Sequence, residues 1–179
     1  MLLEKHKFKI QDIAKLEEIG ILSPEKKFEL INGEIIMMAP IGFKHAKVLE
    51  RLQKTFYKIL PDNYILWIQN PVKKDDENLL YPDLAIYPED IYKKEELPLI
   101  TDAILIVEIS DTTLEYDKNV KLPIYAKANA KEVWIVNLKE NLLEKYTNPS
   151  DGIFTDIHIF KKDDEINIFN SGFKLIDIL

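Results

Sequence analysis

Apolar and polar positions follow two different periods along the chain, and together they predict a mixture of helices and strands. Helical spacing runs through residues 9–20 and 45–60; the first run stops at Gly20, and Pro61 follows the second. Shorter apolar runs, rich in β-branched or aromatic residues and bounded by turn residues, predict strands. These runs lie at residues 26–40, 63–74, 79–90, 102–111, 131–138, 142–147 and 154–169.

Two local signals refine this pattern. Asn32-Gly33 divides residues 26–40 into two strands joined by a tight hairpin turn. Residues 120–130 predict a helix in which Pro123 is tolerable only in the first turn, so this helix should begin near residues 119–121, after a polar loop. The alternating order predicts a mixed α/β fold around one sheet, and 179 residues without repeats or linkers predict a single domain, residues 1–179.

Composition narrows the possible chemistry. The chain has no cysteine, which suits a reducing cytosol and leaves only oxygen or imidazole ligands for a metal. Neither a signal peptide in residues 1–15 nor a membrane-spanning run is recognisable, so we expect a soluble, cytoplasmic protein. A net charge of −7 weakens a general affinity for nucleic acid. One predicted helix carries a basic stripe, for which an ordinary solvated face is the simplest interpretation; it consists of Lys44, Lys47, Arg51, Lys54 and Lys58.

Two carboxylates interrupt runs that otherwise predict buried strands: Asp83 in "YPDLAIYPED" and Glu108 in "LIVEISD". An ionised Glu108 within a strand covered on both faces would be costly without a compensating group. Pro82 cannot donate to a strand ladder, which indicates a strand start or irregularity that could direct Asp83 toward Glu108. A hard divalent cation would relieve the repulsion between the two acids. Solvated strand-end acids, or acids paired with a nearby lysine, remain the alternative.

More polar residues follow Glu108. Ser110 lies on the same strand face, and Lys121, in the following helix, could lean back over the strand end. Asp117 could cap the helix that carries Lys121 or orient that lysine, and capping is the simpler role.

The segments "FELINGEI", a histidine opening the next helix, "PDLAIY" and "LIVEISDTTLEYDKNVKLPIYAKANAKEVWIVN" resemble the Uma-type restriction endonuclease family of the PD-(D/E)XK nuclease superfamily, over almost the whole chain. The resemblance implies an α/β (α+β) fold with a restriction-endonuclease-like core, in which helices flank a central mixed sheet and antiparallel strands are added. Asp83 then matches the first acid of the motif and Glu108 the second. The superfamily's lysine normally stands where this chain has Ser110, whereas the family pattern offers Lys121 on the next helix.

Glu29 and His45 also match family positions, although a solvent-facing acid and a hydrogen-bonded core histidine are the plain alternatives. The resemblance implies that Asp83, Glu108 and the backbone carbonyl of Ile109 hold Mg²⁺ or Mn²⁺, while Lys121 orients the attacking water or stabilises developing charge. The implied protein is a nuclease acting on nucleic acid, DNA in particular, and by analogy a homodimer. The alternative is a non-catalytic nucleic-acid or protein interaction module that keeps the fold.

Overall fold

A computed structural model describes residues 5–23 and 25–179 and is built around a six-stranded sheet. The strand order is β10-β9-β8-β7-β6-β3. The strands are β3 (Tyr64–Ile68), β6 (Leu84–Pro88), β7 (Leu105–Ser110), β8 (Glu132–Asn137), β9 (Leu142–Ser150) and β10 (Ile153–Phe160). Only β7 and β8 pair in parallel, and the other neighbours are antiparallel. The sheet is therefore mixed, as the sequence predicted.

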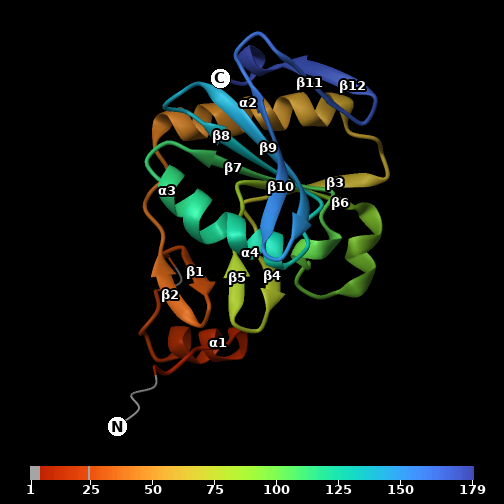
Figure 1. Ribbon diagram of the computed structural model, residues 1–179. Coiled ribbons are helices and arrows are strands. Elements are labelled where there is room, and N and C mark those ends of the chain that lie inside the picture. Colours follow the sequence, from red (N-terminus) through yellow and green to blue (C-terminus); the bar gives the residue numbers. More distant parts are fainter. Residues whose placement is uncertain (1–4, 24) are drawn as a thin grey trace.

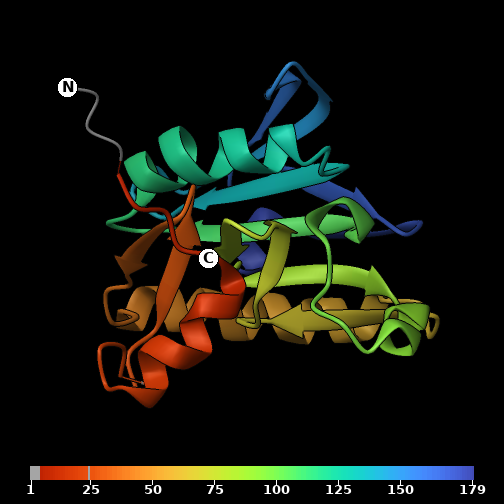
Figure 2. The same cartoon turned by 90° about the horizontal axis from the view of Figure 1, so that it is seen from below.

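Helices cover both faces of this sheet (Figure 1 and Figure 2). Helix α2 (Phe43–Ile59) packs on one face, and the continuous helical segment formed by α3 (Leu114–Tyr116), a π-helical turn (Asp117–Lys121) and α4 (Leu122–Lys127) packs on the other. Strand β7 is buried along its whole length, because Val107 faces the α2 layer while Ile106 faces the α4 layer. Glu108 and Ser110 share the face of Ile106, which places both beneath α3 and α4.

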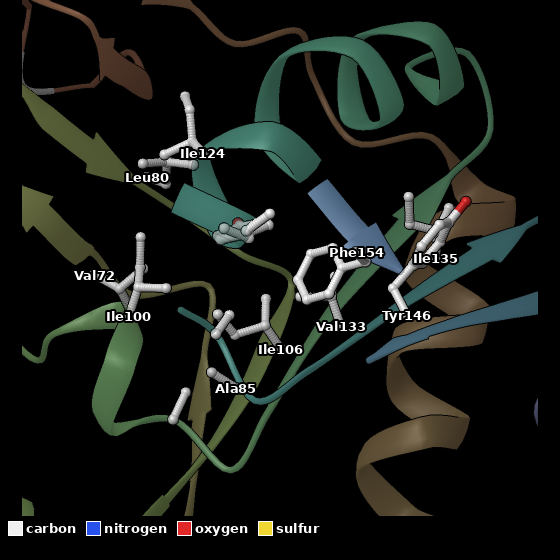
Figure 3. Packing of buried hydrophobic residues seen from close by; sticks show 14 of the residues in the cluster. Val72, Leu80, Ala85, Ile100, Ile106, Ile124, Val133, Ile135, Tyr146 and Phe154 are labelled. Carbon is white, nitrogen blue, oxygen red and sulfur yellow. The ribbon is translucent and has the colours of Figure 1, made fainter. Parts of the chain in front are cut away.

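The α4 side of the sheet holds a hydrophobic core (Figure 3). Ile106, Val133 and Ile135 from the central strands pack there with Ile124 of α4 and Phe154 of β10. Burying such aliphatic and aromatic side chains is the main favourable contribution to folding. This packing fixes α4 against β7, and so fixes the helical residues that precede α4.

A smaller antiparallel sheet, β2-β1-β5-β4, lies below the main sheet in the view of Figure 1, on the side where α1 is found. Its strands are β1 (Phe28–Ile31), β2 (Glu34–Met37), β4 (Val72–Asp75) and β5 (Asn78–Leu80), and helix α1 (Ile10–Glu18) packs against it. The predicted hairpin is confirmed, because Asn32 and Gly33 join β1 to β2 with φ values of 50° and 78°. A Cβ on Gly33 would also lie 2.6 Å from the Lys7 Cβ, so glycine suits this turn for two reasons.

Among the described residues, the remaining elements are one further hairpin and three short helices. They are the hairpin β11 (Glu165–Ile168) and β12 (Ser171–Lys174), and short 3₁₀ helices at Glu89–Lys94, Ile100–Asp102 and Leu175–Asp177. The β11–β12 hairpin packs with α2, through Ile166 and Phe173. Residues 1–4, which belong to the stretch considered for a signal peptide, lie outside the described residues. Within the described ranges, no helix has both the length and the apolarity of a membrane span.

Two predicted strands each divide into two strands of different sheets. Residues 63–74 become β3 of the main sheet and β4 of the small one, and residues 79–90 become β5 and β6. The divisions fall at Gln69, which has a φ of 49°, and at Tyr81–Asp83 around Pro82. Both are points where the chain crosses between sheets, which periodicity alone does not reveal.

The predicted start of the helix near residues 119–121 is wrong, because helical structure begins at Leu114. The expected polar loop is reduced to a short turn after β7. Pro123 is accommodated by the preceding π turn, in which the Leu122 N–H donates to the Asp117 carbonyl, five residues back. In this wider turn the hydrogen bonds run five residues back instead of four, and the change lies directly before Pro123, which has no backbone N–H to donate.

Candidate active site

A pocket of about 460 Å³ opens where β6 begins and β7 ends. The small sheet supplies one wall through β1 and β2, and the α3 end of the helical segment supplies another. Glu29, Asp83, Glu108, Asp117 and Lys121 all line this pocket. The fold therefore brings together residues from four separate parts of the chain.

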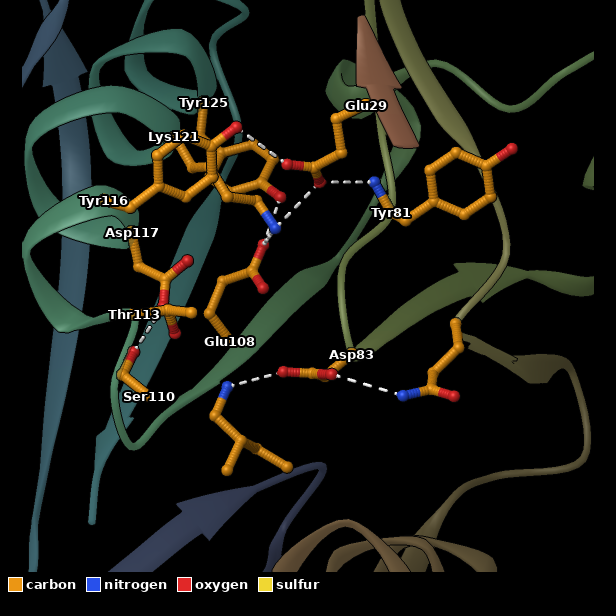
Figure 4. Close-up of polar contacts among 12 residues, drawn as sticks. Glu29, Tyr81, Asp83, Glu108, Ser110, Thr113, Tyr116, Asp117, Lys121 and Tyr125 are labelled. Atoms are coloured by element: carbon orange, nitrogen blue, oxygen red, sulfur yellow. Dashed lines mark hydrogen bonds and ion pairs between the residues drawn. The ribbon is translucent and has the colours of Figure 1, made fainter. Parts of the chain in front are cut away.

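Lys121 lies between two buried carboxylates (Figure 4). Its Nζ is 2.6 Å from Glu108 Oε1 and 3.1 Å from Glu29 Oε1. Only 2% of Lys121, 3% of Glu108 and 1% of Glu29 is exposed, so the alternative of a solvent-facing Glu29 is wrong. These are close ion pairs in a poorly solvated environment, where each group depends strongly on its partners.

Hydroxyl and amide donors complete the arrangement around the two acids. Tyr125 donates its hydroxyl to Glu108 Oε1, and Tyr116 donates to Glu29 Oε2 at 3.0 Å. The backbone N–H of Tyr81 donates to Glu29 Oε1 at 2.9 Å. Glu29 is thereby held by the helical segment on one side and by the β5–β6 connection on the other.

Asp83 is held next to this group by residues from the strand end and from α2. The backbone N–H of Ile109 donates to Asp83 Oδ2 at 2.8 Å, and His45 Nε2 lies 2.9 Å from the same oxygen. The Nε2 of Gln69 reaches Asp83 Oδ1 only at 3.5 Å. The buried Nδ1 of His45 has no hydrogen-bond partner among the described residues, so one nitrogen of this ring faces the aspartate and the other is unsatisfied.

Asp117 does not cap a helix, contrary to the simpler of its two predicted roles. Because the helix begins at Leu114, Asp117 lies inside the helical segment, where it accepts hydrogen bonds from Ser110 Oγ and Thr113 Oγ1, both at 2.7 Å. The Ser110 contact ties the π turn to the end of β7. Ser110 thus holds the helix that carries Lys121 in place.

Burial and crowding of charge alter the proton affinities in the pocket. Burial raises the pKa of Glu108 well above its ordinary value; Lys121 opposes this shift, while Asp117, Asp83 and Glu29 add to it. Burial lowers the pKa of Lys121, but Glu108, Glu29 and Asp117 outweigh that effect, so the ammonium pKa lies well above its ordinary value. Lys121 therefore stays charged, and one ammonium faces an excess of carboxylates.

The donor set fits a hard divalent cation. Glu108 uses Oε1 for Lys121 and Tyr125, and its second oxygen lies on the side of Asp83 (Figure 4). The carbonyl of Ser110 accepts from Leu138 on the β8 side, so strand alternation turns the Ile109 carbonyl to the opposite side, where Asp83 lies. Two carboxylates and a carbonyl suit Mg²⁺, which keeps several waters. Among residues 5–23 and 25–179, no group of three or more His, Asp or Glu side chains forms a metal site by itself.

Several basic side chains close to this arrangement in the sequence lie outside it. Lys118, in the same helical segment as Lys121, pairs with Glu144 at 2.7 Å and does not line the pocket. The basic stripe of α2 also lines no part of the pocket, and its Arg51 contacts the carbonyl oxygen of Leu179.

Sequence reasoning did not identify the roles of Tyr81, Thr113, Tyr116 and Tyr125. Tyr125 was detectable in principle, because it lies one helical turn after Lys121 and therefore on the same helix face. Tyr116 reaches Glu29 from a segment that the sequence predicted as loop. Tyr81 acts through its backbone N–H, a group that does not depend on the type of side chain, so the sequence gives no indication of this role.

Comparison with known proteins gives two findings. The family model Uma2, described as "Putative restriction endonuclease", matches residues 10–175. A solved structure described as a putative nuclease belonging to DUF820, from Anabaena variabilis ATCC 29413, is similar with a TM-score of 0.75 and 16% identity, over 96% of this chain and 97% of that one. Curated proteins provide no match. At this identity the structural similarity supports the fold, and the family assignment rests on the sequence model.

Proposed function

The chain belongs to the Uma2 family of putative restriction endonucleases, and from this membership we propose that it is a Mg²⁺- or Mn²⁺-dependent nuclease that hydrolyses phosphodiester bonds in DNA. The observation that carries the proposal is the position of Lys121, charged and buried between Glu108 and Glu29 in the pocket that also holds Asp83. An ion pair with a purely structural role needs one carboxylate for each ammonium. Here the carboxylates in the pocket outnumber the single ammonium of Lys121, and this excess of negative charge favours an additional cation.

Each residue has a defined part in this proposal. Asp83, Glu108 and the Ile109 carbonyl would hold the ion, which when bound supplies charge neutralisation at the phosphate and makes a nearby water more acidic. Lys121 donates to the attacking water or to the charge that develops on the phosphate. Tyr116 and the Tyr81 amide fix Glu29, and Glu29 in turn fixes the ammonium of Lys121. His45 and the Ile109 amide orient the Asp83 carboxylate.

The test is strand scission. The purified protein is incubated with plasmid, single-stranded DNA and RNA in Mg²⁺ or Mn²⁺, with a chelator control. We expect metal-dependent cleavage that Asp83→Ala abolishes together with Mn²⁺ binding, because the variant loses one of only two carboxylate ligands. Asp90→Ala is the matched control, since Asp90 is an exposed acid outside the pocket. Absence of scission on every substrate would contradict the proposal and favour the non-catalytic interaction module.

A further inference from the structure

The pocket has two chemically different walls. The buried ionic residues form its floor, whereas the chain from the end of β2 to the start of α2 contributes an almost wholly apolar rim. We call this rim the apolar lip; the pocket-lining residues in it are Met37, Met38, Ala39, Pro40, Ile41 and Gly42.

The lip presents large apolar side chains to solvent. Met37 is 49% exposed, Met38 36% and Ile41 46%, and the adjoining Phe43 is 85% exposed. Single exposed apolar residues are common on protein surfaces, but a contiguous group at the mouth of a pocket indicates a binding surface. Both ends of the lip are anchored, in β2 and in the long helix α2, so it stands at a fixed place beside the ionic floor.

The size of the pocket argues against an intact duplex as the ligand. The carboxylates of Glu29 and Glu108 are buried at the pocket floor, whereas the phosphates of B-DNA lie along a wide, stiff rod that a 460 Å³ pocket cannot admit. The pocket is also poor in basic side chains that could contact phosphate; apart from His45, these are Lys27 and the already paired Lys121. Contacts other than those with phosphate must therefore supply much of the affinity.

A nucleotide in an unpaired strand matches both walls. Its phosphate is free to reach the ionic floor, and its base, no longer stacked on neighbours, offers a flat apolar face to the lip. Proteins that bind single strands without sequence preference place the flat faces of bases against aromatic side chains, and the aliphatic lip offers an apolar surface for the same face.

We propose that the apolar lip holds an unstacked nucleobase next to the scissile phosphate, so that the site acts on unpaired strands rather than on intact duplex. This inference rests on the proposed nuclease function and specifies its substrate. Ile41 and Met38 are the specificity-determining side chains.

The experiment compares kcat/KM for one oligonucleotide as a single strand, as a blunt duplex, and as a single strand with abasic residues around the cleavage point. We expect the single strand to be cleaved at least about 10-fold better than the duplex, and abasic substitution to lower kcat/KM by about 10-fold, because the apolar area that the base buries against the lip is lost. Ile41→Ser and Met38→Ser should each lower cleavage of the normal strand. Neither should add to the loss caused by the abasic residues, because the contact is then already missing.

Ile21→Ser is the control, since Ile21 is 66% exposed and does not line the pocket. It should cleave like wild type, and thermal melting should show that all variants remain folded. Equal or better cleavage of duplex, or an abasic strand cleaved as fast as the normal one, would overturn the inference while leaving the nuclease function standing. Failure to cleave any strand would instead overturn the nuclease function.

Discussion

At the scale of single residues, the distinctive feature is a lysine that comes from a helix and not from the strand that carries the second acid. The strand position two residues after Glu108 holds Ser110, whose hydroxyl binds Asp117 and so steadies the helix that delivers Lys121. The chain thus uses the strand position to support the lysine and the helix to supply it. Strand spacing predicted that Ser110 and Glu108 share a face, and the structure confirms it.

Lys121→Met should remove catalysis while leaving metal binding. In the proposed mechanism the ammonium acts on charge that develops during attack on the phosphate, so its loss should lower kcat by about 100-fold or more. Mn²⁺ binding, measured by calorimetry, should persist because Asp83 and Glu108 remain. Without the cation, Glu29 and Glu108 are left unpaired and buried, which should cost about 3–5 kcal/mol of folding stability. Added Mg²⁺ should restore part of that loss in thermal melting.

Lys118→Met is the matched control. Lys118 lies in the same helical segment but outside the pocket, and it also pairs with a buried glutamate, Glu144 of β9. The variant should lose stability without losing cleavage. If Lys121→Met cleaves at close to the wild-type rate, the assignment of the lysine is wrong.

At the scale of elements, the sequence predicted which segments are helix or strand better than where they end. Periodicity identified the strands around Glu108 and the helix around Leu52, because each buries one regular face. It did not detect that residues 63–74 and 79–90 each serve two sheets. Nor did it detect the early start of the helix before Pro123, since the π turn that precedes the proline and its contact with Ser110 of β7 leave no mark on the local apolar period.

The π turn itself should be required for the site. Inserting an alanine after Asn119, an exposed residue within the turn, adds a residue beyond the single extra one that a π turn accommodates, and should rotate the residues before it by about 100° relative to α4. Because α4 is fixed in the core, Tyr116 should leave Glu29 and Asp117 should leave Ser110. We expect cleavage to be lost and the free energy of unfolding in urea to fall by roughly 2–4 kcal/mol, from two broken hydrogen bonds.

Asn119→Ala, which removes the side chain and keeps the spacing, should retain cleavage. Circular dichroism should show that the insertion variant keeps its helices and strands. A folded insertion variant with wild-type cleavage would mean that the register of the π turn does not position the site.

At the scale of the whole molecule, the main sheet ends at β10, an eight-residue edge strand. Its exposed isoleucines, Ile153, Ile157 and Ile159, point to one face. A long, apolar edge with an unpaired ladder is usually protected or paired in a native protein. Pairing with a second copy would cover it, and this would account for the homodimer expected by analogy with other nucleases.

Antiparallel pairing of β10 with its own copy has a favourable register about Ile157. A two-fold axis at this residue sets Ile157 opposite its equivalent and Asp156 opposite His158 of the second copy, so apolar side chains meet each other and the carboxylate meets a hydrogen-bonding imidazole. We expect light scattering to give about twice the 20.9 kDa of one chain. Ile157→Lys should yield a monomer, because two lysines would then face each other across the axis. Ile21→Lys, which changes an exposed isoleucine elsewhere, should remain dimeric. A monomeric wild type would contradict the dimer, and a dimeric Ile157→Lys would place its interface away from β10.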